Sequence, residues 1–220
     1  MQEKLKQIQD YIVKMPSLPV TVSKIMEICN DPKTSPIDLN KVISVDPVLM
    51  GRVMKLINSA YYGLSQKITS LVRAIIMLGI NTVKNLALST AVMGAIGKSK
   101  ESQSLDMEGF WRHSLCAGVT SKLIAKQCRV DSKKLEEFFV AGLLHDVGKI
   151  AINNKLPEDL LNSLVCSDKE KITLYEAEKK VMNTNHIEIG CMIIKYWKLG
   201  QDIHDTVLYQ VYAPMHPAGQ

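Results

Sequence analysis

The segment Leu143-Leu144-His145-Asp146-Val147-Gly148-Lys149 places a histidine next to an aspartate near the end of an apolar helical run. Side chains of neighbouring helix residues diverge by about 100°. Both can still reach one ion if the ion lies beyond the helix end and other helices supply further ligands. Because imidazole and carboxylate are ordinary ligands of Zn, Fe, Mn and Ni, the segment predicts a divalent metal site in a helical protein.

The surrounding sequence also predicts helices, with clear start signals. Ser35-Pro36 and Asp46-Pro47 each combine an N-cap residue with a proline at the first helical position. Thr173–Glu176 and Asn185–Glu188 have the spacing of a capping box. No segment shows sustained alternation of apolar and polar residues. We therefore expect an all-α fold.

The composition and net charge indicate a soluble globular protein and do not indicate one that binds nucleic acid. A hydrophobic content of 46% and a charged content of 22% are typical of a soluble globular protein. The net charge of +5 is mild, and its lysines and arginines form no stripe interleaved with aromatic residues. Nucleic acid is therefore not an expected partner, and binding to it through the mild positive charge is the third and weakest hypothesis.

The sequence also predicts a compartment. The five cysteines form no Cys-x-x-Cys pair, which is typical of reduced thiols in a cytosol. The N-terminus has no signal-peptide pattern, and no apolar run approaches the roughly 18 residues of a membrane span. We expect a cytoplasmic protein without membrane association.

Several motifs occur together with the His-Asp doublet. They are Leu18-Pro19, Asp46-Pro47, Leu56-Ile57-Asn58-Ser59-Ala60-Tyr61-Tyr62-Gly63, Ile68 and Ala74-Ile75-Ile76-Met77-Leu78-Gly79. The C-terminal half resembles the HD superfamily of metal-dependent phosphohydrolases. The whole, from about Met15 to Val211, resembles the HDOD family, the HD-related output domain of bacterial signalling proteins.

The resemblance implies a fold and a setting. We expect an HD-domain-like helical bundle with an N-terminal helical lobe packed on it. The expected single domain covers residues 1–220, with an N-terminal lobe at 1–100, an HD-like lobe at 101–212 and a tail at 213–220. It also implies a bacterial source and a role downstream of a sensor or regulator. Such domains are often joined to receiver or cyclic-di-GMP signalling domains.

The resemblance also implies a set of ligands. His113 lies where the first family histidine belongs, and His145 and Asp146 form the doublet. His186 matches an additional histidine of relatives that bind several metals. Lys149 matches a lysine that lies near substrate phosphate in the enzymes, and it would be a catalytic residue only if this chain is an enzyme. The implied cofactor is one divalent ion: Fe, Mn, Zn or Ni.

The chain departs from the enzymes near its end. The positions of a late His-His pair fall near Gln210 and Val211, and valine cannot bind a metal. Asp202 and Asp205 are late carboxylates without a recognisable ligand context. His204 is expected on the surface of the last helix. Fewer ligands are therefore present than the multi-metal enzymes use.

Ordinary structural roles compete with these assignments. His145 and Asp146 can be a hydrogen-bonded pair at a helix end, His186 an N-terminal helix residue, and Lys149 a lysine favoured by the helix dipole. Tyr61 and Tyr62 can contact a partner or pack against their own loop.

The leading hypothesis is a non-catalytic signalling output module. It would act by binding a protein partner, with an ion or a nucleotide in the partly retained pocket. The alternative is a metal-dependent phosphohydrolase acting on a nucleotide or cyclic dinucleotide, in which an ion activates water and Lys149 steadies the phosphate. The sequence makes no prediction of oligomeric state.

Overall fold

The computed structural model describes residues 2–15, 20–29, 31, 33–59, 62, 66–96, 104–131 and 134–211. Within these ranges the regular structure is helical and no strand occurs, which confirms the predicted all-α class. The predictions that concern Pro19, Tyr61 and the tail at 213–220 lie outside the described residues.

The chain divides into two compact units. Unit 1 combines Met1–Met15 with Ser99–Gln127 and Phe138–Gln220, and unit 2 combines Pro16–Lys98 with Cys128–Glu137. The border before Ser99 lies beside the predicted lobe border at residue 100. The first helix, however, belongs to unit 1, which also contains the His-Asp doublet.

Unit 2 is built around one apolar helix. Its helices are α2 (Val20–Cys29), α3 (Pro36–Ser44), α4 (Pro47–Ile57), α5 (Leu71–Leu78) and α6 (Ile80–Ile96). Helix α6 contacts α2, α4 and α5, and its residues 85–92 are buried. The predicted caps are present: Ser35 accepts from the backbone of Asp38, and the Asp46 side chain accepts from Val48 and Leu49.

Among the described residues, no single helix has both the length and the hydropathy that crossing a membrane requires. Helices α5 and α6 meet these criteria only when taken together, and they are bent by 117° relative to each other.

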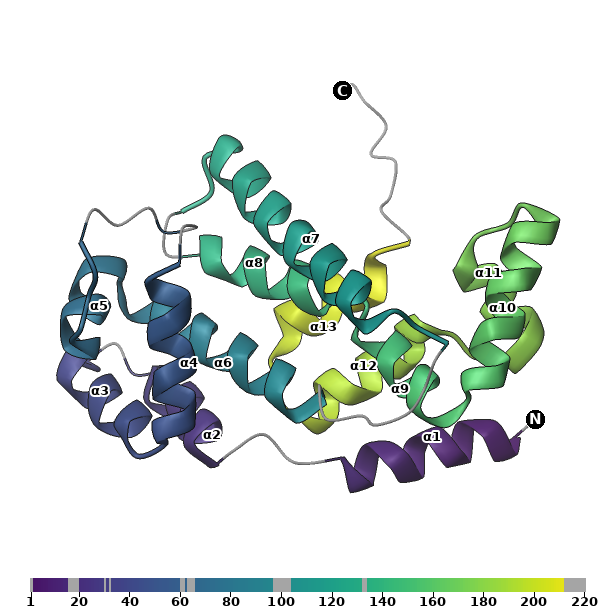
Figure 1. The fold of residues 1–220 in the computed structure, drawn as a ribbon, viewed down its shortest axis with the longest axis horizontal. Coiled ribbons are helices and arrows are strands. Elements are labelled where there is room, and N and C mark those ends of the chain that lie inside the picture. Colours follow the sequence, from purple (N-terminus) through teal and green to yellow (C-terminus); the bar gives the residue numbers. More distant parts are fainter. Residues whose placement is uncertain are drawn as a thin grey trace. The chain divides into compact units, whose positions relative to one another are not determined.

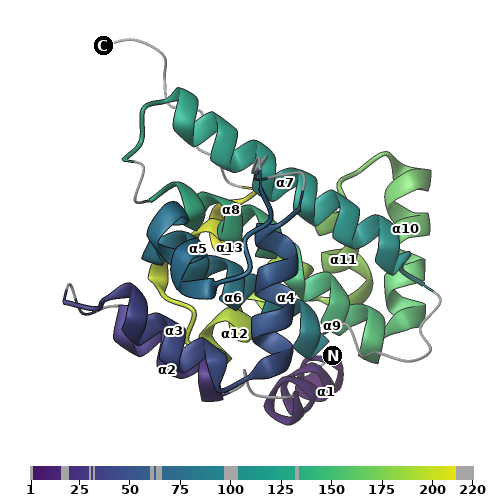
Figure 2. The same ribbon diagram turned by 60° about the vertical axis from the view of Figure 1, so that its left-hand side comes forward.

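Unit 1 carries the candidate site. Its helices are α1 (Gln2–Lys14), α7 (Met107–Gln127), most of α8 (Leu135–Leu144), α9 (Val147–Lys155), α10 (Pro157–Glu170), α11 (Leu174–Met182), α12 (His186–Tyr196) and α13 (Gln201–Tyr209). Helices α10 and α11 form an antiparallel pair, and α7 is the longest helix drawn (Figures 1 and 2). Helix α12 contacts α1, α9 and α13, so it forms the centre of this unit.

Two glycines allow the helices around the doublet to approach closely. A Cβ atom at Gly142 of α8 would lie 2.8 Å from the carbonyl oxygen of Ala117 in α7. A Cβ atom at Gly148 of α9 would collide with the carbonyl oxygen of His186 and lie 2.7 Å from the Gly190 nitrogen in α12. Both approaches involve backbone atoms that cannot move aside. These glycines therefore bring α7 and α12 to the turn that carries His145 and Asp146.

Candidate metal centre

The His-Asp doublet forms the turn between two helices. Helix α8 ends at Leu144 and α9 begins at Val147, as the sequence predicts for the end of the apolar run. Asp146 takes the N-cap position of α9, but its side chain makes no capping hydrogen bond. Its carboxylate is 5% exposed and lies among side chains from other helices. The turn therefore presents both side chains to the interior of unit 1.

Three side chains converge at this turn. The Oδ2 atom of Asp146 lies 3.2 Å from Nε2 of His145 and 3.5 Å from Nε2 of His113, which comes from α7. The two Nε2 atoms are 3.3 Å apart. The geometry marks these residues as a group that could hold a metal ion. His113 is 60% exposed, so the group opens to solvent on the α7 side.

The spacing of the three donor atoms fits one ion. In a tetrahedral site with bonds of 2.0–2.1 Å, neighbouring ligand atoms are about 3.4 Å apart. The observed separations of 3.2, 3.3 and 3.5 Å lie close to that value. Two nitrogens and a carboxylate oxygen suit zinc and other divalent transition metals.

The backbone fixes the proton on His145. Its Nδ1 atom lies 2.7 Å from the carbonyl oxygen of Gly142. A carbonyl oxygen only accepts, so Nδ1 carries the hydrogen. Nε2 therefore faces His113 and Asp146. This is the usual arrangement of a metal-binding histidine, whose second nitrogen donates to the backbone.

Nearby hydrogen bonds and charges shift the pKa values of both Asp146 and His145. Burial by itself would raise the pKa of Asp146, but the hydrogen bond from His145 and the charge of Lys149 outweigh burial and hold this pKa well below its usual range. Burial by itself would lower the pKa of His145, but the hydrogen bond and the negative charge of Asp146 raise it instead. Lys149 bonds to Oδ2 of Asp146 at 2.6 Å.

His186 lies on the opposite side of the same carboxylate. Its Nε2 atom is 3.6 Å from Oδ1 of Asp146, whereas His113 and His145 face Oδ2. The ring is buried, and its Nδ1 atom is 2.5 Å from Oε2 of Glu178. The structure thus brings together all five predicted residues: His113, His145, Asp146, Lys149 and His186.

Glu178 is a residue that the sequence motifs do not reveal. It has no exposed surface, although it lies on the otherwise amphipathic helix α11. Leu174, Glu178 and Met182 recur at intervals of four residues, which places the glutamate on the apolar side of α11. A carboxylate on the buried face of a helix is the signal that could have identified it.

Gln210 and Val211 occupy the positions at which the resemblance places a late His-His pair in the multi-metal enzymes. Gln210 donates a hydrogen bond of 3.0 Å from Nε2 to the backbone oxygen of His145, and Val211 is exposed. The C-cap residue of α13 therefore supplies a side-chain amide to the backbone of the doublet. This agrees with the absence of a late His-His pair from the sequence.

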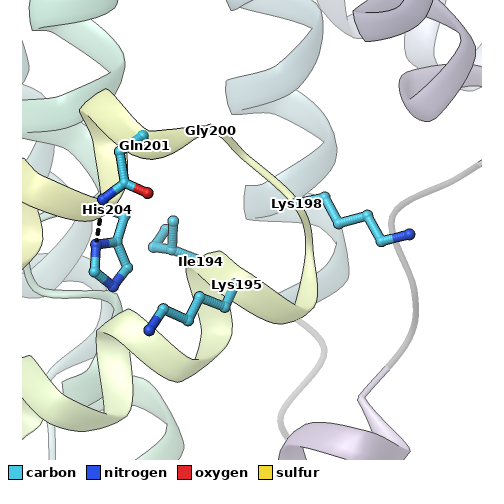
Figure 3. Close-up of a pocket in the computed structure, with 6 residues that line it drawn as sticks. All are labelled: Ile194, Lys195, Lys198, Gly200, Gln201 and His204. Atoms are coloured by element: carbon cyan, nitrogen blue, oxygen red, sulfur yellow. Dashed lines mark hydrogen bonds between the residues drawn. The ribbon is translucent and has the colours of Figure 1, made fainter.

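The prediction that His204 is a surface residue is wrong. It is 8% exposed, because the face of α13 that carries Ile203, His204 and Val207 is buried. Its ring lies beside Gln201 in a shallow pocket between α12 and α13 (Figure 3). The pocket contains none of the five predicted residues; it is lined by Ile194, Lys195, Lys198, Gly200, Gln201 and His204.

A curated relative matches nearly the whole chain. It is an uncharacterised protein of Treponema pallidum, 24% identical over 212 residues, and the match covers 96% of this chain. The chain spans about two fifths of that relative's length, since the match covers 40% of it.

Solved structures share the fold. A crystal structure of an HDOD domain protein of unknown function from Geobacter sulfurreducens is 30% identical, with a TM-score of 0.80, and the match covers 98% of this chain and 72% of that one. A candidate phosphohydrolase from Shewanella amazonensis is 23% identical, with a TM-score of 0.74 and coverage of 96% and 72%. A candidate signal transduction protein from Marinobacter aquaeolei is 20% identical, with a TM-score of 0.74 and coverage of 98% and 51%.

The likeness extends to a family model. The model of the HDOD domain matches residues 15–212, which is nearly the whole chain. The convergence of His113, His145 and Asp146 at the turn between α8 and α9 agrees with the HD-type doublet in the sequence. The chain therefore belongs to the HDOD domain family.

Proposed function

We propose that this chain is a non-catalytic output module of bacterial signalling that binds one divalent ion and a protein partner. The observation that carries the proposal is the composition of the metal centre. Three donor atoms converge on the position of one ion, and among the described residues no second group of this kind occurs. Phosphoester hydrolysis also needs a positioned phosphate and further charge stabilisation. Lys149 could supply part of this charge stabilisation.

An ion at this centre would connect two parts of unit 1. His113 comes from α7, whereas His145 and Asp146 come from the turn between α8 and α9. A divalent ion would supply two positive charges there and would be held by these three side chains. Since His113 is largely exposed, ion binding would restrain α7 against the turn.

Exposed apolar side chains support a protein partner. On α7, Leu123 and Ile124 are 59% and 58% exposed, and Phe138 at the start of α8 is 39% exposed. Leu123 and Ile124 are consecutive in the chain, and adjoining exposed apolar side chains often mark a protein interface. Because α7 also carries His113, the ion and the partner would act on the same helix.

The alternative function is that of a metal-dependent phosphohydrolase acting on a nucleotide or cyclic dinucleotide. Lys149 favours it, because its ammonium lies beside the three donors and could bind a phosphate. The opening of the centre at His113 would give a substrate access. In this reading His113, His145 and Asp146 would hold an ion, and the chemistry it would supply is that of a Lewis acid for phosphoryl transfer.

Metal analysis and turnover assays decide between the two functions. We expect elemental analysis of the purified protein to find about one divalent ion per chain, in agreement with the three donors. We expect no turnover of phosphoesters, nucleotides or cyclic dinucleotides with Mn²⁺ or Fe²⁺. The variants His145→Ala and Asp146→Ala should lose the ion, whereas the neighbouring surface variant Arg112→Ala should keep it. Turnover that disappears in both site variants, but not in Arg112→Ala, would establish the phosphohydrolase instead.

A crosslinking experiment tests the partner. A photoreactive amino acid at position 123 should crosslink one defined protein in cells that express the chain. The same residue at position 161, an exposed leucine on α10, is the matched control. Equal crosslinking from both positions would argue against a partner surface on α7.

A further inference from the structure

Glu178 is buried against the N-terminus of α12. Its side chain has no exposed surface, and its Oε2 atom accepts a 2.8 Å hydrogen bond from the backbone nitrogen of His186. The same oxygen lies 2.5 Å from Nδ1 of the His186 ring. Its second oxygen, Oε1, is buried without a hydrogen-bond partner in the described part of the chain. One oxygen of the Glu178 carboxylate therefore contacts both the backbone and the ring of His186.

The local fold determines where this oxygen lies. Asn183, at φ 58°, ends α11 in the left-handed region, and the Asn185 side chain accepts from the backbone of Ile187 and Glu188. The first turn of α12 is thereby held, and the His186 N–H points at Glu178. The backbone bond thus places the oxygen beside the ring, and Nδ1 contacts the same atom.

The contact assigns the proton on the ring. Oε2 of Glu178 already accepts from the His186 backbone, and Nδ1 of the ring meets this same acceptor oxygen, which favours a hydrogen on Nδ1. In the neutral ring, Nε2 then carries a lone pair and faces Oδ1 of Asp146 at 3.6 Å. By themselves a lone pair and a carboxylate repel each other, and an ion bound at the centre would relieve this repulsion.

We propose that Glu178 is a positioning residue that holds His186 in its Nδ1–H form, with Nε2 directed at Oδ1 of Asp146, a residue of the metal centre. The inference rests on the proposed ion centre and assigns a role to a residue outside its predicted ligand set. His186 would then join the three donors as a fourth ligand, and Glu178, His186 and the ion would form a carboxylate–histidine–metal chain in which the outer carboxylate orients the ring. A glutamate that only caps α12 would need the backbone bond and not the ring contact.

Two substitutions separate these roles. Glu178→Gln keeps a carbonyl oxygen that can accept from Nδ1, whereas Glu178→Met has similar length but no oxygen. ¹⁵N spectra of the imidazole rings read the proton position directly, at about pH 8, above the usual titration range of histidine. We expect a protonated Nδ1 and an unprotonated Nε2 in the wild type and in Glu178→Gln, and a shift of the proton toward Nε2 in Glu178→Met.

Zinc affinity, measured by titration calorimetry, gives a second readout. Loss of an outer partner typically weakens a site about 10- to 100-fold, and we expect a loss of this size in Glu178→Met. Glu178→Gln should restore most of the affinity. In the background of His186→Ala, Glu178→Met should cause no further loss. Glu176→Ala removes the capping box on the same helix, and it should lower stability without changing the proton position or the affinity.

Each result leads to one conclusion. A His186 ring protonated at Nε2 in the wild type, alone or with Nδ1, overturns the proposal, as does a Glu178→Met variant with an unchanged ring. If the wild type binds no zinc but the proton positions are as expected, the ion centre fails and the positioning role stands. If Glu178→Met does not fold, the ring in the wild type and in Glu178→Gln still decides the outcome.

Discussion

Nζ of Lys149 lies 2.6 Å from Oδ2 of Asp146, the oxygen that also faces Nε2 of His113 and of His145. The ammonium thus balances the charge of Asp146 at the position where an ion would bind. Like charges near 4 Å repel by about 4 kcal/mol at the effective dielectric constant of a protein surface. Lys149 should therefore weaken the binding of a divalent ion.

The substitution Lys149→Met tests this competition. Without the ion it should destabilise the protein by about 1.5–3 kcal/mol, because a buried carboxylate loses a charged hydrogen bond. It should also tighten zinc binding about tenfold or more, since a competing cation is removed. Chemical denaturation with and without zinc measures both effects. Lys155→Met, on the same helix, should leave zinc affinity unchanged. Weaker zinc binding in Lys149→Met would contradict the competition.

His113 should matter for the ion and little for folding. Its ring is 60% exposed, so His113→Ala should change the free energy of unfolding by no more than about 0.5 kcal/mol without metal. The substitution removes one of the three donors. Zinc affinity should therefore fall by more than about 100-fold, which is the largest loss expected from removing an outer partner. Calorimetry and urea denaturation measure the two quantities. The matched control is Arg112→Ala, an exposed neighbour on α7, and equal zinc affinity in both variants would exclude His113 as a ligand.

Local signals explain why the helices could be predicted. Ser35, Asp46 and Thr173 cap their helices as expected, because a capping side chain needs only its own backbone neighbours. The capping box predicted at Asn185–Glu188 is incomplete. Asn185 caps α12, but the Glu188 side chain instead accepts from Thr184.

Long-range contacts were harder to predict. The doublet of His145 and Asp146 is visible in the sequence, but the contact between Glu178 and His186 depends on how α11 and α12 pack. His204 was misplaced for the same reason, because the sequence does not show which face of α13 lies on Cys191 and the rest of α12. Motifs thus identify the chemistry, and tertiary packing decides which polar side chains are buried beside it.

Gly148 should be essential for the approach of α9 to α12. In Gly148→Ala the new methyl group would collide with the His186 carbonyl, which is part of a helix backbone and cannot yield. We expect a loss of at least about 2 kcal/mol of stability, typical of overpacking, together with weaker zinc binding. Gly51→Ala is the matched control, because a Cβ atom there meets nothing within 4 Å. It should stabilise helix α4 by about 0.5–1 kcal/mol. Thermal denaturation of both variants measures the difference, and equal melting temperatures would contradict the close approach.

The pair of His145 and Asp146 should make both stability and metal affinity depend on pH. The raised pKa of His145 means that its contribution to stability is fully present below the unfolded value of about 6.5 and is lost as the pH rises through the folded value. The lowered pKa of Asp146 means that its contribution is present above about 4 and is lost on further acidification. Without metal, stability should therefore fall on both sides of a maximum near pH 5–6. Zinc must displace the Nε2 proton of His145, so its affinity should rise over the range in which metal-free stability falls. Urea denaturation and zinc titration from about pH 5 to 8 measure the two trends, with Asp146→Asn as the variant that should flatten the stability profile. A zinc affinity that is constant across this range would mean that His145 gives up no proton to the ion.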